Sequence, residues 1–534
     1  MLPTNLQSPQ VLLKRFKVAK DRRNSSWWSH LQEAYDYAAP QRETLNSHTP
    51  GQKKNVDIFD NTAITGLQTF ANRMQKAVVP PWQKWDKLVP GTDVPEEQHE
   101  AMVEYEGEEM TLIAALEEIT DRVFEYIHRS NFSSRIYEAF IDFGISTGTI
   151  TCEYDARRDE LVFNSVPLSQ LYLLPGPNGQ VGDHWREHDV EGEHIYALWP
   201  ESEIDEETQR VIKEKPQQKH QVVEGCLESD GTYYYVVILV KKKQLIFWQD
   251  AGETSPFISF RGMVVPGEVY GRGPILQVLT DIKTLNVVKE FELTAAAIAA
   301  SGAWTGRNDG VFNPYTVQVA PGVVIPVGSN DTGNPTIAAL PMNFDFNVNH
   351  IVAEELRNSI NKALFAEPLG QMDDPTKTAT EMQIRYQMHL EEAGAFFARL
   401  QTELVEKLTT RVVYLLQREG KIPPIKVDGR DVAVKHTSPI ARVMDMEDLQ
   451  NLQMALGEVA MLGEEAITMT FDTDEVGKYI AKKRSIDPDL IRTDQERQQL
   501  KQQMAAAVQQ AQQAAQQQAS GQGNAGSRGP SSAG

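Results

Sequence analysis

The chain has 534 residues, of which 41% are hydrophobic and 24% are charged, a composition typical of a folded protein with several cores. Its formal net charge of −22 argues against a protein that coats nucleic acid through a basic surface, although an acidic wall would let DNA slide past without adhering. The two cysteines, Cys152 and Cys226, are too few for a disulfide framework or a structural zinc site and favour a reducing compartment.

The N-terminal part of the chain is predicted to be mainly helical. Apolar residues recur at helical spacing in 10–40, 61–79, 100–130 and 133–143, and prolines follow the first two segments. The N-terminus lacks the pattern of a signal peptide, and no stretch reaches the run of about 18–20 apolar residues that a membrane-spanning helix needs. We therefore expect no membrane among the partners.

Residues 150–265 change to the alternating pattern of β-strands. Short runs such as TITCEYD, ELVFNSV and TYYYVVILV are rich in β-branched and aromatic residues. An acidic insert near 198–214 interrupts these strands with a helical pattern, and nothing in its residues indicates its role.

A hairpin of two helices is predicted next. A long helix opens at Pro274 and runs to residue 301, a module with short strands occupies 302–348, and a second helix covers 349–365. Since both helices meet this module, they should form a projection with the module at its tip. A single copy would expose apolar rows and an alanine face there, and further copies in a closed ring are the simplest partner. The residues assigned to this self-association are Ile275, Leu279, Ile282, Leu285, Ala295, Ala296 and Ala299.

A loop with a defined restart follows the hairpin. Thr378 and Glu381 have the spacing of a capping box, which would start a helix over 379–419. That helix would be about 60 Å long at ~1.5 Å per residue. The loop itself, 366–378, is punctuated by glycine and proline. The loop residues that we single out are Gly370, Gln371, Met372, Asp373, Asp374 and Lys377.

The remainder of the chain is mixed. Residues 441–463 and 474–484 have helical patterns. Residues 501–534 begin as an Ala/Gln-rich helix and end in a Gly/Ser-rich stretch that we expect to be disordered.

Four motifs suggest chemistry, and each has a simpler explanation. GISTG (144–148) has the spacing of a serine hydrolase with Ser146 as nucleophile, but a helix precedes it and strands follow, the reverse of a nucleophile elbow. YGRGP (270–274) precedes a helix without a complete phosphate-binding motif, which favours a turn that aims the helix. HLEE (389–392) is one partial metal motif on a solvated face, and the basic stretch 12–23 fits an amphipathic surface helix better than a nucleic-acid site. We predict no catalytic residue, no cofactor and no metal.

Taken in order, these segments resemble one known family. FDNTAITGLQTFANRMQKAVVPPWQKW (59–85), YGRGPILQVLTDIKTLNVVKEFELTAAA (270–297), TKTATEMQIR (376–385) and the Ala/Gln-rich end are similar to the portal, or head-to-tail connecting, proteins of short-tailed, podovirus-type bacteriophages. The resemblance covers nearly the whole chain. It implies an α+β, mainly helical, portal-type ring subunit with a wing, stem helices, a small β clip, a long wing helix and a C-terminal crown.

The resemblance also implies a domain map. Its parts are an N-terminal wing (1–270, β-rich over 150–265), a first stem helix (271–301), a clip (302–348), a second stem helix (349–365), a tunnel loop (366–378), a long wing helix (379–419), a wing and crown region (420–500), and an Ala/Gln-rich helix that frays into a disordered tail (501–534).

The function implied by the resemblance is structural rather than enzymatic. In this family twelve copies form a ring at one capsid vertex of the virion, assembled in the host cytoplasm, and double-stranded DNA enters and leaves through it. Twelve helices about 10 Å apart would leave a bore near ~28 Å, which fits a duplex closely. The implied partners are further copies, the DNA, the terminase motor, the major capsid and scaffolding proteins, and the tail adaptors. Two alternatives stay open: a cytosolic oligomeric scaffold or adaptor without a DNA channel, and a hydrolase using Ser146.

Overall fold

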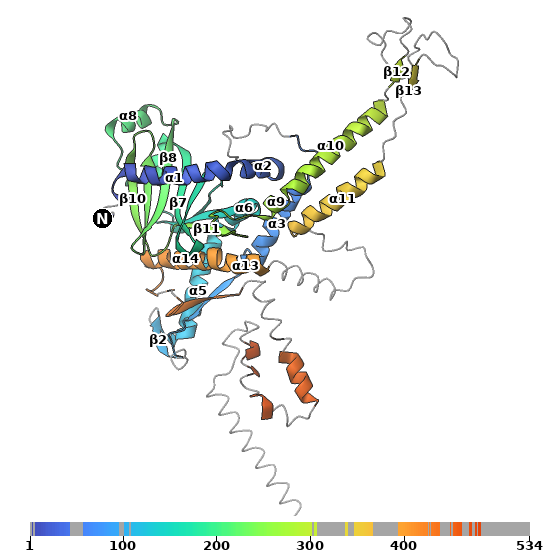
Figure 1. Ribbon diagram of the computed structural model, residues 1–534. Coiled ribbons are helices and arrows are strands. Elements are labelled where there is room, and N and C mark those ends of the chain that lie inside the picture. The colour runs from blue at the N-terminus through green and yellow to red at the C-terminus, as the bar shows by residue number, and fades with distance from the viewer. Residues whose placement is uncertain are drawn as a thin grey trace, which may run out of the picture. The chain divides into compact units, whose positions relative to one another are not determined.

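The computed structural model divides the chain into two units, Met1–Ile440 and Ala441–Gly534 (Figure 1). The first unit is α+β, as predicted, and its sheets are antiparallel. The structure describes residues 3, 6–42, 57–95, 101–105, 108–301, 304–306, 337–339, 346–366, 394–425, 427 and 429–437 of the first unit, and 449, 452–461, 469–472, 476–477 and 479–481 of the second.

The helices and strands follow one another along the first unit. The helices are α1 (Pro9–Ser26), α2 (Trp28–Ala38), α3 (Thr62–Val78), α5 (Leu112–Arg129), α6 (Phe132–Ile145), α7 (Gly192–Leu198), α8 (Glu206–Glu214), α9 (Pro274–Gln277), α10 (Leu279–Ser301), α11 (Phe346–Ala363), α13 (Gly394–Leu400) and α14 (Glu406–Arg418). The strands are β1 (Asp86–Pro90), β2 (Met102–Tyr105), β3 (Glu108–Thr111), β4 (Thr147–Asp155), β5 (Glu160–Ser165), β6 (Leu171–Pro175), β7 (Val181–Glu191), β8 (Lys219–Ser229), β9 (Thr232–Leu239), β10 (Gln244–Gly252), β11 (Phe257–Arg261), β12 (Trp304–Gly306), β13 (Ile337–Ala339) and β14 (Val432–His436).

The N-terminal segment forms two helices, α1 and α2, rather than the single helix predicted over 10–40. At the end of α1 the hydroxyls of Ser25 and Ser26 both donate to the carbonyl of Arg22, at 3.1 Å. Such side-chain bonds compete with the backbone ladder of a helix, which explains the break at this point. The helices predicted over 61–79 and 133–143 are confirmed as α3 and α6.

Residues 100–130 contain a hairpin as well as a helix, so the prediction of one helix there is wrong at its start. β2 pairs antiparallel with β3, and α5 begins directly after them. The hydroxyl of Thr111 accepts a hydrogen bond from the backbone N–H of Ala114 at 3.3 Å. This bond caps α5, so the helix begins at the C-terminal end of the strand pair.

The strands predicted within 150–265 form two sheets. One has five strands in the order β10-β9-β8-β7-β6, and the other has three in the order β11-β4-β5. β8 and β9 are joined by Asp230 and Gly231 alone, both with positive φ, at +53° and +78°. A two-residue Asp-Gly connection of this kind matches the twist of paired strands and fixes their register.

The five-stranded sheet is covered by helices on both faces. Residues that alternate along β8 and β9 point to opposite faces, so Val223 and Val236 belong to one buried cluster and Val222 and Val237 to the other. The first cluster includes Leu12, Phe16 and Ala19 of α1, which lies across the sheet (Figure 1). The second includes Ile195 of α7 and Ile212 of α8; α8 is the helix of the acidic insert predicted near 198–214, and α7 ends where that insert begins.

The two predicted stem helices lie side by side (Figure 1). The first is interrupted at Val278, so a one-turn helix α9, opened by Pro274, precedes α10. α11 packs against α10 and against α3. β12 and β13, which come between the two helices in the sequence, pair with each other, and β13 confirms one of the strands predicted in this module. The rest of 302–345 lies outside the described residues.

The helix predicted over 379–419 is described from Gly394 onward. α13 and α14 are joined by a π-helical turn, Gln401–Val405, which carries Glu403. The backbone N–H, Nε and Nη2 of Arg261 on β11 donate to the Glu403 carboxylate at 3.0, 3.1 and 2.6 Å. Both side chains are largely buried, so this pair ties the helix to the three-stranded sheet. After α14 the chain returns as β14, which pairs with β1.

The motifs GISTG and YGRGP pack against each other. Ser146 lies in the turn between α6 and β4, is fully buried, and donates from Oγ to the carbonyl of Gly271 at 2.6 Å. The N–H of Gly273 donates to the carbonyl of Ile145 at 3.0 Å. The hydrolase alternative is therefore wrong for Ser146, because a buried hydroxyl held by a backbone carbonyl meets no substrate. YGRGP is the turn from which α9 starts, as favoured by the sequence.

The second unit has helical segments at 452–460, 476–477 and 479–481, in agreement with the patterns predicted over 441–463 and 474–484. Residues 501–534 lie outside the described part of the chain. Across both units, none of the described helices is long and apolar enough to cross a membrane.

We expect Gly273→Ala to destabilise the first unit. A Cβ at this position would lie 2.3 Å from the carbonyl oxygen of Gly144 and 2.5 Å from the carbonyl carbon of Ile145, and backbone atoms cannot move aside cheaply. Overpacking of this kind costs about 1–3 kcal/mol. The loss should appear as a lower melting temperature. The control is Gly457→Ala in the second unit, where nothing lies within 4 Å. If both variants and the wild type had the same melting temperature, the tight packing of Gly273 against residues 144–145 would be refuted.

Candidate self-association surface of the stem hairpin

The stem hairpin, α10 with α11, has one side turned toward its own chain. On α10, Ile282, Leu285 and Asn286 are 5%, 2% and 7% exposed. Their spacing of three and four residues places them on one face of a helix. α11 buries Ala353 and Ile360 in the same way. Helices α2 and α3 pack against this inner side.

Four residues assigned to self-association from the sequence belong to this covered side. Ile275, Leu279, Ile282 and Leu285 are all buried within a single chain, so the expectation that a monomer exposes them is wrong. The reason is that segments distant in sequence, residues 57–59 with α2 and α6, supply the covering atoms. These four side chains support the hairpin from inside.

The opposite side of α10 is also apolar and faces solvent. Val287 and Phe291, one helical turn apart, are 43% and 65% exposed. Of the three alanines assigned from the sequence, Ala296 is exposed, Ala295 is half-buried, and the side chain of Ala299 lies outside the described residues. Val287 and Phe291 were not predicted as members of the site. The sequence does contain a signal for them, because α10 has apolar residues on two sides and an ordinary surface helix has them on only one.

The exposed side of α10 is an uncharged stripe. At about 100° per residue, Thr280, Thr284, Val287 and Phe291 fall on the same side of the helix. The charged residues at the edges of this stripe are Asp281, Lys283, Glu290 and Glu292. An apolar centre with a charged rim is the usual arrangement of a protein–protein interface.

α11 adds apolar surface to the hairpin. Ile351 and Val352 are 66% and 38% exposed, and Leu293 of α10 is 48% exposed. Several exposed apolar side chains on two neighbouring helices favour a surface that binds another protein.

Asn286 fastens α10 to the segment that precedes α3. The backbone N–H of Phe59 donates to its Oδ1 at 2.7 Å, and its Nδ2 donates to the carbonyl of Asp57 at 3.2 Å. Because a buried amide side chain is costly without partners, these two bonds select one position of the helix against the body.

Asp60 fastens α11 in a similar way. Nε and Nη2 of Arg357 donate to its Oδ2 at 3.1 and 2.7 Å, and the backbone N–H of Thr62 donates to its Oδ1 at 2.9 Å. Burial alone would raise the pKa of Asp60, but the hydrogen bonds from Thr62 and Arg357 outweigh it and lower the pKa below its ordinary value. The carboxylate therefore stays charged at neutral pH and holds the start of α3 and the middle of α11 together.

Two further contacts close the hairpin at its base. Ser359 of α11 donates from Oγ to Oδ2 of Asp281 on α10 at 2.9 Å. Leu364 packs on Gly66 of α3 so closely that a Cβ there would lie 2.6 Å from Leu364 Cδ1. The base of the stem is thus held by polar and apolar contacts together.

The predicted channel loop cannot be placed on this surface. Its residues lie outside the described part of the chain: Gly370, Gln371, Met372, Asp373, Asp374 and Lys377, together with the restart residues Thr378 and Glu381. Their roles stay predictions.

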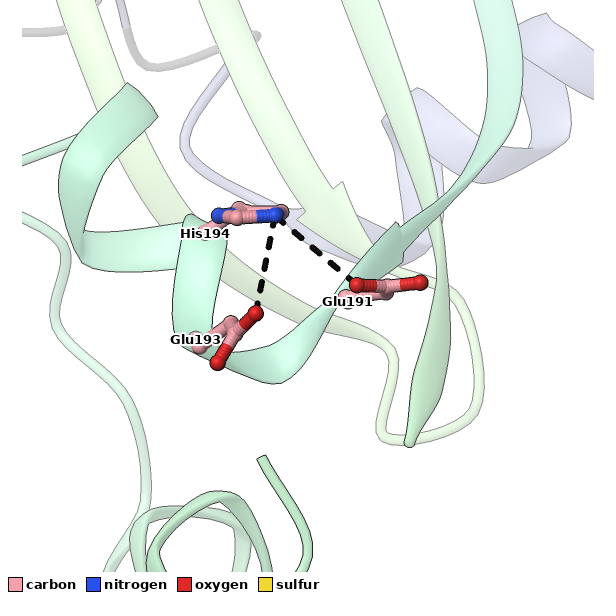
Figure 2. Close-up of side chains that lie close together, drawn as sticks. All are labelled: Glu191, Glu193 and His194. Carbon is pink, nitrogen blue, oxygen red and sulfur yellow. Dashed lines mark ion pairs between the residues drawn. The ribbon is translucent and has the colours of Figure 1, made fainter. Parts of the chain in front are cut away.

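A group of three potential metal ligands lies where β7 ends and α7 begins. In Figure 2 the ring of His194 lies beside the carboxylates of Glu191 and Glu193. Its Nε2 is 3.8 Å from Oε2 of Glu191 and 3.7 Å from Oε1 of Glu193. His194 and Glu193 are exposed, and these distances are those of loose surface ion pairs. The group is best explained as a solvated charge cluster.

Comparison with known proteins identifies the family. The model of the bacteriophage head to tail connecting protein family matches residues 10–491. The chain belongs to this family. It is also similar to the "Probable portal protein" of Bordetella phage BPP-1, at 23% identity over 509 residues, covering 90% of this chain and 88% of that protein.

Solved structures of gene transfer agent (GTA) particles also match this member of the connector family. A chain of the neck of the empty particle, computed with C6 symmetry, is 12% identical, with a TM-score of 0.31 over 74% of this chain and 86% of that one. A chain of the native particle's neck, computed with C12 symmetry, is 13% identical, with a TM-score of 0.28 over 76% and 90%.

We expect acid to loosen α11 through Asp60. Since the pKa of Asp60 is lowered on folding, its stabilisation is complete above the ordinary value of 3.8 and is lost as the pH falls through the folded value. Asp60→Ala should weaken the anchoring by about 1–3 kcal/mol at neutral pH. Amide exchange in α11, corrected for its intrinsic pH dependence, should rise in this variant and should lose its added sensitivity to acid.

The control for this experiment is Asp21→Ala, which removes an exposed carboxyl of α1. If α11 were protected equally in Asp60→Ala and in the wild type, the anchoring role of Asp60 would be refuted.

Proposed function

We propose that this connector protein is a portal subunit whose copies form a ring at one capsid vertex, with a channel through which double-stranded DNA is packaged and ejected. The observation that carries the proposal is the uncharged outer stripe of α10, with Val287 and Phe291 left in water by their own chain. Membership of the head-to-tail connecting family supports the same assignment.

The stripe favours a ring for a geometric reason. A contact between the outer side of one hairpin and a different side of the next is head-to-tail, and such contacts end only when the ring closes. We propose twelve copies, following the family resemblance. The stem helices would then line the channel, and residues 302–348 would form the clip at its end.

The channel would pass DNA without gripping it. The net charge of −22 disfavours strong binding of phosphate by the wall. Residues 366–378 would narrow the bore, with Gln371, Asp373 and Asp374 offering polar groups and Lys377 as the basic exception. The packaging ATPase would be a separate terminase, because the chain carries no complete phosphate-binding motif.

The remaining partners follow from this position in the particle. We propose contacts with the major capsid and scaffolding proteins during assembly in the host cytoplasm, and with tail adaptors in the virion. The protein would act as a conduit and an assembly platform rather than as an enzyme.

We expect the purified protein to form a ring with a central hole, visible by electron microscopy and by native mass. Phe291→Asp should shift the population toward single copies, since a carboxylate in place of the largest apolar side chain of the stripe should cost about 2–4 kcal/mol per interface. Its circular dichroism should match that of the wild type because the replaced side chain is exposed. Phe291→Leu keeps an apolar contact and should still assemble.

Two results would contradict these expectations separately. A wild-type protein that stays monomeric, or forms an assembly without a hole, would refute the portal proposal and favour a scaffold or adaptor. Rings of Phe291→Asp as stable as those of the wild type would refute the role of the stem stripe alone.

A further inference from the structure

The two helical covers of the five-stranded sheet carry opposite charges. α1 covers one face, and α7 with α8 covers the other. Because the sheet lies between them, these two outer surfaces cannot touch within one chain. Each is therefore available to a different neighbour.

The outer surface of α1 is basic on a strongly acidic chain. With Leu12, Phe16 and Ala19 buried, the exposed positions include Lys14, Lys17 and Arg22, against one exposed acid, Asp21. Within the described residues these three cations form no ion pair. Val11 and Val18 lie among them and are 49% and 48% exposed. Cations interleaved with exposed valines form a surface suited to an acidic, partly apolar partner.

The outer surface of α7 and α8 has the complementary character. Glu201, Glu203 and Glu206 are exposed, and none of them forms an ion pair with a described residue. Tyr196 and Leu198, at the end of α7, are 39% and 57% exposed. α8 also carries two exposed cations, Arg210 one turn after Glu206 and Lys213 in the last turn, but the eight acidic residues of 191–214 outnumber them.

Part of this acidity has a local explanation. Asp205 caps α8 by accepting a hydrogen bond from the N–H of Thr208 at 3.3 Å, and Glu206 in the first turn suits the helix dipole. Glu201 and Glu203 precede the helix and serve neither purpose. Their charge, next to the exposed Tyr196 and Leu198, is left for another molecule.

We infer that the outer surface of α1 in one copy binds the outer surface of α7–α8 in the next copy of the ring. This inference rests on the ring of the proposed function and names a second contact, separate from the stem. The valines of one copy would meet Tyr196 and Leu198 of the other, and the cations and acids would pair around them.

A second copy fits better than a foreign acidic protein because both halves of the contact are present on every chain. A head-to-tail ring requires two different, complementary surfaces on opposite sides of each subunit. The two sides of this sheet meet that requirement in both charge and apolar content. The rim pairs lie in water, so the contact should weaken as salt rises.

The test uses two charge-reversed forms of the full chain. The first carries Lys14→Glu, Lys17→Glu and Arg22→Glu, and the second carries Glu201→Lys, Glu203→Lys and Glu206→Lys. Alone, each form brings like charges together at every contact. The protein concentration at which half of the chains are assembled should therefore be at least tenfold higher than for the wild type. All six substitutions are at exposed positions, and circular dichroism checks that both forms fold.

Mixing the two forms gives the decisive result. The reversed α1 of the first form is acidic and matches the reversed insert of the second, while the two unaltered surfaces match as well. Only alternating rings satisfy every contact, so native mass should show even-numbered rings with the two forms in equal numbers. A control pair, Arg157→Glu with Arg158→Glu in the turn between β4 and β5, should assemble like the wild type.

The outcomes separate this inference from the ring itself. If wild-type rings form but each charge-reversed form assembles equally well, the inference is overturned, and the two surfaces belong to other partners. Mixed rings of random composition, or no rescue on mixing, would overturn it too. If the wild type forms no ring, the proposed function fails first, and the inference fails with it.

Discussion

One chain cannot cover helix α10. Its inner side is buried against α2 and α11, while its outer side leaves Val287 and Phe291 in water. Burying such side chains fully is worth about 1.5–3 kcal/mol each. A second protein surface on the stem is therefore favoured, and in a family of head-to-tail connectors another copy of the chain is the natural candidate.

The rest of the first unit holds this helix in one direction. The packed glycines of GISTG and YGRGP fix the start of α9, and Ser146 closes that junction with its bond to Gly271. Asn286 and Asp60 fasten the two stem helices to the segment before α3. A self-association surface needs such fixed support. A hairpin that could swing freely would have to be ordered at every contact, and the entropy lost in ordering it would weaken the association. The charged covers of the five-stranded sheet would add a second contact at a distance from the stem.

Local patterns in the sequence predicted much of this fold. Helical spacing located α3 and α6, alternation located the strands of 150–265, and Pro274 marked the start of the stem. The prediction was wrong where short-range chemistry intervened, as in the hairpin of β2 and β3, whose partner helix is capped by Thr111. It was also wrong about which side of the stem is exposed. Spacing reveals that α10 has two apolar sides, but the atoms that cover one of them come from residues such as Asp57 and Phe59, more than two hundred positions away.

Solvent access to the outer stripe tests the central claim most directly. Cys152 and Cys226 are both buried, so a thiol introduced by Phe291→Cys would be the one readily labelled group among the described residues. Assembled and dispersed protein, separated by sedimentation, should differ: the introduced thiol should react rapidly in single copies and at least tenfold more slowly in the assembled fraction. A thiol introduced by Arg158→Cys, in the turn between β4 and β5, checks that the reagent reaches both fractions. Equal labelling at position 291 in both fractions would contradict the account, because it would mean that assembly leaves the stripe in water.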